Sequence, residues 1–164
     1  VQDWGGEWWE YDITFAAQSG PLARSVSAAL TALGSGRGLL LFADPSILTK
    51  SLTQPITLAI PIAGGNVVQT QGWPHGLPAV ASGDFISIGA GRDTRLHQIA
   101  FDATADINGF ATLTIFPAIR TSLPANTRLE VNQPHVLLRP TGAVPTRIER
   151  AARHRFTLSA REAI

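Results

Sequence analysis

The stretch from residue 52 to residue 140 constrains the fold most strongly, because it alternates short apolar runs with glycine, proline and asparagine. Runs this short, bounded by turn residues and free of helical periodicity, are typical of β-strands. The Asn108-Gly109 pair predicts a type I′ hairpin between a run ending near Ala105 and one beginning at Ala111. We therefore expect a small barrel or sandwich, with strands at residues 56–60, 84–89, 96–103, 111–116, 128–131 and 135–139.

Both ends of the chain alternate in the manner of half-buried strands. In the opening run, Trp8, Glu10, Asp12 and Thr14 fall on the face opposite to an aromatic one, and in the closing run Phe156, Leu158 and Ala160 share a face. A lone terminal strand is not stable, so we expect the closing strand to pair with the opening one. The middle block then becomes an insertion: residues 1–52 and 142–164 form an outer domain, and residues 53–141 form the barrel.

Residues 19–36 predict the one helix of the chain. Pro21 suits the first helical turn after a cap at Ser19 or Gly20, and Gly34 suits a left-handed C-terminal cap. The stripe Leu22, Val26, Ala29, Leu30 and Leu33 should lie on the sheet, and residues 38–45 should form a short buried strand. The predicted outer-domain core is Trp9, Tyr11, Ile13, Phe15, Leu22, Val26, Leu30, Leu33, Phe156 and Leu158.

No motif in the sequence predicts catalysis or a bound group. Cysteine is absent, which removes thiolate chemistry, and the glycine-rich LGSGRG follows a helix, the wrong context for a dinucleotide loop. The stretch around Asp106 has Ile115 where a calcium loop needs its closing glutamate, and the histidines are scattered. We expect no enzyme activity, cofactor or metal, and the net charge of +1 gives no reason to expect a membrane or specific nucleic-acid partner.

Two features indicate a surface used by a partner. Trp8 lies on a polar strand face that offers no core for an indole, so we expect it to be covered by a neighbouring subunit or, alternatively, by residues that precede this stretch or a local loop. Arginines concentrate from Arg139 to Arg161, opposed there by Glu149 alone; this is the pattern of a solvated face, of pairing with an acidic neighbouring subunit or of phosphate contacts. The candidate subunit interface is Trp8, Arg147, Arg150 and Arg153.

The order of these pieces resembles the distal tail proteins of long-tailed (siphovirus-type) bacteriophages and related prophage tail proteins. The resemblance lies in QDWGGEWWEYDITFAA with its following helix, GLLLFADP, the run from GDFISIG to FPAIR, and HRFTLSAREAI. It implies a mainly β fold with one short helix, in which a split, β-sandwich-like outer domain carries an inserted OB-like barrel. The family normally has a strand before this opening stretch, so we expect an incomplete N-terminus; the outer domain is also shorter than the family pattern.

By this resemblance the chain is a structural virion protein of the phage tail tip. It implies an adaptor ring, sixfold in the best-known examples, between the tail tube protein and the baseplate hub protein, with the tape measure protein as a further partner. The alternative is a β-barrel carbohydrate-binding module. Trp73 is then the candidate sugar platform, and Phe85, Phe101, Phe110 and Phe116 are expected to lie mostly in the core.

Overall fold

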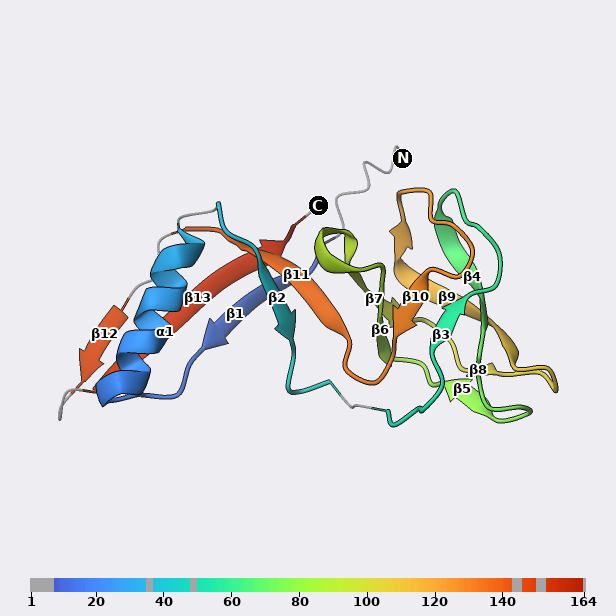
Figure 1. The fold of residues 1–164 in the computed structure, drawn as a ribbon, viewed down its shortest axis with the longest axis horizontal. Helices are drawn as coiled ribbons and strands as arrows, with labels where there is room; N and C mark the ends of the chain where they lie inside the picture. Colours follow the sequence, from blue (N-terminus) through green and yellow to red (C-terminus); the bar gives the residue numbers. More distant parts are fainter. Residues whose placement is uncertain (1–7, 35–36, 48–49, 143–145, 150–152, 164) are drawn as a thin grey trace. The chain divides into compact units, whose positions relative to one another are not determined.

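The chain folds into two compact units, shown in Figure 1. A computed structural model describes residues 8–34, 37–47, 50–142, 146–149 and 153–163, the side chains of 146–149 excepted. The first unit is discontinuous and comprises Val1–Leu41 and Leu137–Ile164, and the second comprises Phe42–Val136. The expected fold class is confirmed: the chain is mainly β, with a single α-helix in the described residues and a small closed barrel.

The first unit is built on a sheet that joins the two ends of the chain. Its strands follow the order β1 (Glu10–Thr14), β13 (Arg153–Glu162), β11 (His135–Pro140) and β2 (Leu40–Ala43). β12 (Thr146–Glu149) pairs with β13 beside this path. Antiparallel pairing sets Glu10 opposite Arg161 and Thr14 opposite Thr157, and Figure 1 shows these segments from opposite ends of the chain side by side. The expected pairing of opening and closing strands is confirmed.

Helix α1 (Gly20–Leu33) packs against β13, and its ends lie where proline and glycine predict them. Pro21 occupies the first turn and Ser19 is the N-cap residue, although its side chain makes no capping hydrogen bond. Gly34 ends the helix with φ of 60° and ψ of 175°, so the cap is not the left-handed one expected; its N–H donates to the Thr31 carbonyl at 3.0 Å. A residue with a side chain would be strained at this positive φ, which explains the glycine.

The helix stripe that packs on the sheet differs from the predicted one at Leu22 and at Ala29, which is exposed. Leu30, Phe156 and Leu158 are buried as expected, and Val26 and Leu33 are half-buried, but Leu22 is 55% exposed. Ala23 is buried in its place, so the least exposed stripe of the helix is Ala23, Val26, Leu30 and Leu33. A small residue lets the first turn approach the sheet closely. The expected core residues of the opening stretch are half-buried: Trp9, Tyr11, Ile13 and Phe15.

The second unit is a closed barrel in the order β10–β3–β4–β9–β7–β6. Its strands are β3 (Ile56–Leu58), β4 (Gly65–Gln71), β6 (Phe85–Ile88), β7 (Arg95–Ile99), β9 (Phe110–Ile119) and β10 (Arg128–Glu130). A two-stranded sheet of β5 (Pro78–Val80) and β8 (Ala103–Thr104) adjoins it, and a short 3-10 helix spans Gly91–Asp93. The barrel interior is filled by aliphatic side chains together with Trp73.

The barrel differs from the sequence-based expectation in three respects. The run at 135–139 was assigned to it, but β11 pairs with β13 in the first unit instead, through Leu138 opposite Glu162. None of the four phenylalanine rings expected in the core is buried: Phe85 is half-buried, Phe110 and Phe116 are 45% and 48% exposed, and Phe101 is 68% exposed because the chain leaves β7 before reaching it. Strand β4 was not predicted at all, since its sequence GNVVQTQ is largely polar; its buried Thr70 donates its hydroxyl proton to the Ala111 carbonyl at 2.8 Å.

A turn exists at Asn108-Gly109, but it is not the expected type I′ hairpin: β8 pairs with β5, and β9 pairs with β4 and β7. That turn needs positive φ at both central residues, whereas Gly109 has φ of 80° and Asn108 is not among the positive-φ residues. The Gly109 N–H donates to the Asp106 carbonyl at 3.1 Å, and the Asp106 carboxylate accepts from the Asn108 and Phe110 N–H groups. Asp106 therefore closes the loop through its side chain, and these hydrogen bonds lower the pKa of Asp106.

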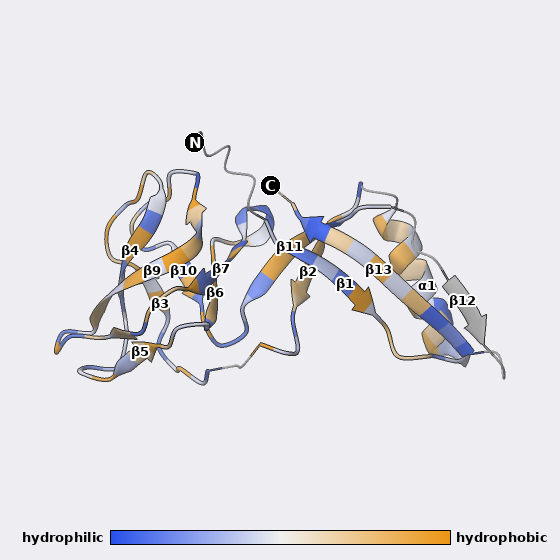
Figure 2. Cartoon of the chain, turned by 180° about the vertical axis from the view of Figure 1, so that it is seen from behind, coloured by the Kyte–Doolittle hydropathy of each residue, from blue (hydrophilic) through white to orange (hydrophobic). Residues whose placement is uncertain are grey.

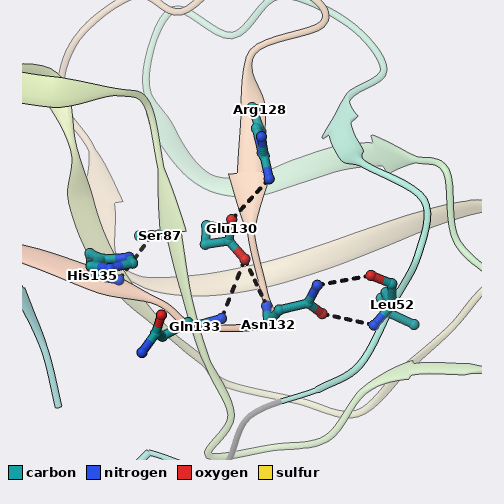
Figure 3. A network of polar contacts seen from close by, with 7 residues as sticks. All are labelled: Leu52, Ser87, Arg128, Glu130, Asn132, Gln133 and His135. Carbon is teal, nitrogen blue, oxygen red and sulfur yellow. Dashed lines mark hydrogen bonds and ion pairs between the residues drawn. The ribbon is translucent and has the colours of Figure 1, made fainter. Parts of the chain in front are cut away.

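A polar clamp links the two segments that lead into and out of the barrel (Figure 3). The side-chain amide of Asn132 accepts a hydrogen bond from the Leu52 N–H and donates one to the Leu52 carbonyl, both at 2.8 Å. Glu130 in turn accepts from the Asn132 and Gln133 N–H groups and pairs with Arg128 at 3.1 Å. The clamp fixes Leu52 to the end of β10, although 80 residues separate the partners.

Candidate assembly surface

One face of the β1–β13 pair carries a continuous set of exposed polar side chains together with Trp8. Alternation along β13 buries Phe156, Leu158 and Ala160 and leaves the odd-numbered positions outward. Because residues opposite each other in register share a face, these positions join the outward side chains of β1. We call this surface the Trp8 face: Trp8, Glu10, Asp12, Thr14, Arg153, Arg155, Thr157, Ser159 and Arg161.

Trp8 is held at one end of this face by two charged neighbours. Its indole N–H donates to the Glu10 carboxylate at 3.0 Å, and the guanidinium carbon of Arg161 lies 5.9 Å from the ring centroid. Glu10 and Arg161 are register partners, so the strand pairing itself brings both charges to the ring. The indole remains 40% exposed. It is thus oriented by its neighbours but not covered, as an anchor for a partner should be.

A small open depression adjoins Trp8. It has a volume of about 140 Å³ and is lined by Glu10, Tyr11, Asp12, Thr141, Ser159 and Ala160. The Ser159 hydroxyl donates to the Asp12 carboxylate at 2.6 Å, and Thr141 holds the Ser159 carbonyl through its N–H at 2.9 Å. The carboxylates of Glu10 and Asp12 give this end of the face an acidic side, which belongs to β1.

The opposite end of the face is basic. Arg153 and Arg155 lie outward at the start of β13, and Figure 2 shows hydrophilic residues at both ends of this strand. The rise of a strand places Arg153 about 26 Å from Arg161. The register puts Arg147 opposite Arg155 and Glu149 opposite Arg153. Of the predicted interface residues, Trp8 and Arg153 thus share one face; Arg150 and the side chain of Arg147 lie outside the described residues.

The sequence places Glu10 and Asp12 on the same strand face as Trp8, but it does not identify them, or Arg161, as interface residues. The signal was present in the two alternating runs, but it depends on register: only the pairing of Glu10 with Arg161 shows that a carboxylate and a guanidinium meet at Trp8. A shift of one residue would have sent Arg161 to the opposite face.

Other features considered from the sequence do not form a site. Trp73 is buried, with its indole N–H donating to the Thr70 hydroxyl at 2.7 Å, so it anchors a loop and offers no sugar platform. His97 is also buried, and its Nδ1 lies 2.7 Å from the Pro117 carbonyl. Within the described ranges, no group of three or more acidic or histidine side chains could hold a metal ion.

In the part of the chain that the structure describes, no helix has the length and apolarity needed to cross a membrane. No protein-family model and no curated protein matches this chain.

Proposed function

We propose that this chain is a structural subunit of a phage tail tip, where copies of it form an adaptor ring between the tail tube and the baseplate hub. The observation that carries the proposal is the layout of the chain. Its two ends build one sheet, in which β1 lies beside β13, and the barrel is inserted between them. The resemblance to distal tail proteins implies the same layout, and it does so through stretches that cover both ends and the barrel.

The Trp8 face supports self-association through its distribution of charge. Its acidic side belongs to β1, with Glu10 and Asp12, and its basic end belongs to the start of β13, with Arg153 and Arg155. A ring is built from contacts between two different patches of each subunit. Two patches of opposite charge on one chain favour such a head-to-tail contact and disfavour a contact between like patches.

In this function the remaining partners are the tail tube protein, the baseplate hub protein and, as a further candidate, the tape measure protein. The protein is assembled in the cytoplasm of the bacterial host and then resides in the virion, at the tail tip. It acts by holding its neighbours in place, without chemistry of its own.

The test is the mass of the purified full chain in solution, measured by light scattering and native mass spectrometry over a range of concentrations. We expect a closed oligomer, with six subunits as the stoichiometry that the resemblance implies. Rising salt should shift it towards monomers, because charge pairs at an exposed surface are screened over about 8 to 10 Å at moderate ionic strength. A monomer that persists at high concentration and low salt contradicts the proposal.

A further inference from the structure

The barrel presents a second surface, on the outside of strands β4 and β9. Their register sets Val67 opposite Thr114, Gln69 opposite Thr112 and Gln71 opposite Phe110. Along β9 the residues Ala111, Leu113 and Ile115 are buried, so the alternate residues point outward. We call this surface the outer strip: Val67, Gln69, Phe110, Thr112, Thr114 and Phe116.

Aromatic rings lie at both ends of the outer strip. Phe110 is 45% exposed and Phe116 is 48% exposed, and the rise of a strand separates them by about 20 Å. At the Phe116 end a row crosses three strands, because Gln98 of β7 lies opposite both Phe116 of β9 and Phe85 of β6. Phe85 and Gln98 are half-buried there. The Phe116 ring, the Gln98 amide and the Phe85 ring therefore lie in a row across the three strands.

Polar groups without charge fill the space between the rings. The side chains of Gln69, Thr112 and Thr114 make no hydrogen bond to other described residues, so their amide and hydroxyl groups are available to a ligand. No charged residue occurs in Gly65–Gln71 or in Phe110–Ile119. The strip thus combines apolar ring faces with neutral donors and acceptors over a length greater than that of one sugar.

The uncharged side chains and exposed rings of the outer strip favour some classes of ligand over others. Binding to the phosphate backbone of nucleic acids depends on lysine and arginine, and the strip has neither. An oligosaccharide presents apolar C–H faces, which suit phenylalanine rings, and hydroxyl groups, which suit glutamine and threonine. Exposed rings that the chain does not cover are a common mark of a binding surface. We propose that the outer strip binds a neutral oligosaccharide along β9.

This proposal does not depend on ring formation, and its test leaves ring formation aside. The full chain, labelled with ¹⁵N, is titrated with neutral oligosaccharides of glucose, galactose, mannose, rhamnose and N-acetylglucosamine, and separately with a short oligothymidylate. We expect at least one neutral oligosaccharide to shift the backbone amide signals of Gln69, Thr112 and Thr114. Phe110→Ala and Phe116→Ala should each weaken that binding by about fivefold or more, because each removes one ring contact.

Phe101→Ala is the matched control, since Phe101 is an exposed phenylalanine of the same unit that lies off the strip. It should leave the affinity unchanged. The proposal is overturned if no neutral oligosaccharide shifts these amides, or if all three alanine variants bind like the parent. It is likewise overturned if oligothymidylate alone binds, or if the amides shift only with protein concentration, which would assign the strip to a second copy of the chain.

Discussion

Two neighbouring tryptophans of the opening stretch have different surroundings and should respond differently to truncation. Trp9 is half-buried on the side of the sheet that faces the core, whereas Trp8 stands outward on Glu10 and Arg161. Trp9→Ala should lower the melting temperature of the first unit, because large-to-small changes in packed positions cost about 3 to 5 kcal/mol when burial is complete and less here. Trp8→Ala should leave melting nearly unchanged and should weaken assembly by about 2 kcal/mol or more, measured as the concentration at which oligomers dissociate. Equal losses of melting temperature with assembly intact would refute an interface role for Trp8.

At the same scale, His97 should make the barrel sensitive to acid. The pKa of His97 is lowered from 6.5 to about 4, chiefly by burial; the hydrogen bond to the Pro117 carbonyl opposes this shift, and the charges of Arg95 and Arg120 add to it. A carbonyl only accepts, so the neutral ring carries its proton on Nδ1. In the unfolded chain His97 takes up a proton near pH 6.5, whereas in the folded chain it does so only near pH 4. The free energy of unfolding therefore falls as the pH decreases through this window. The loss from His97 should reach about 2 kcal/mol at pH 5, measured by urea unfolding. His97→Gln keeps a donor for Pro117 and should remove this part of the pH dependence; an unchanged slope would contradict the assignment.

At the scale of elements, the barrel depends on the clamp between Leu52 and Asn132. The Asn132 amide serves both the N–H and the carbonyl of Leu52. Asn132→Asp keeps the acceptor but loses the donor, and it places a second carboxylate beside Glu130, so it should destabilise the barrel by about 1 to 3 kcal/mol. Gln133→Glu is the control, because Gln133 joins the network through its backbone N–H alone. Hydrogen exchange of the barrel amides measures the effect; equal protection in both variants would show that the clamp contributes little.

Elements whose pattern is local could be read from the sequence, and those that depend on a distant partner could not. Pro21 and Gly34 mark the helix ends because capping is decided within a few residues. Strand β4 could not be predicted from its polar sequence, because its buried Thr70 hydroxyl is satisfied by a hydrogen bond to the Ala111 carbonyl, 41 residues away. β11 has the same apolar texture as a barrel strand, and only its pairing with β13 assigns it to the first unit. The outward position of Phe116 was within reach, since burial of Leu113 and Ile115 on one face of β9 requires it.

At the scale of the whole molecule, the boundaries between the two units could be predicted only approximately from the sequence. The lone strands at the chain ends predict a discontinuous outer domain. The unit that contains the barrel spans Phe42–Val136, whereas the predicted range is 53–141, so it both begins and ends earlier than expected. The candidate site shows the same division. Trp8 and the arginine-rich return could be named one by one, whereas their common face required the register of β1 with β13.

The proposed ring itself can be tested by reversing charges on its two patches. Asp12→Lys makes the β1 side of the Trp8 face more basic, and Arg153→Glu makes the start of β13 more acidic; both side chains are exposed, so folding should be preserved. If the acidic side of one subunit meets the basic end of the next, each variant alone sets like charges against each other and should assemble poorly. In an equal mixture, subunits that alternate around a ring with an even number of members restore opposite charges at every contact. We therefore expect native mass spectrometry to show oligomers in the mixture that neither variant forms alone. Unimpaired assembly of both single variants would mean that these charges are simply solvated, and impaired assembly that mixing does not rescue would mean that the two patches do not meet.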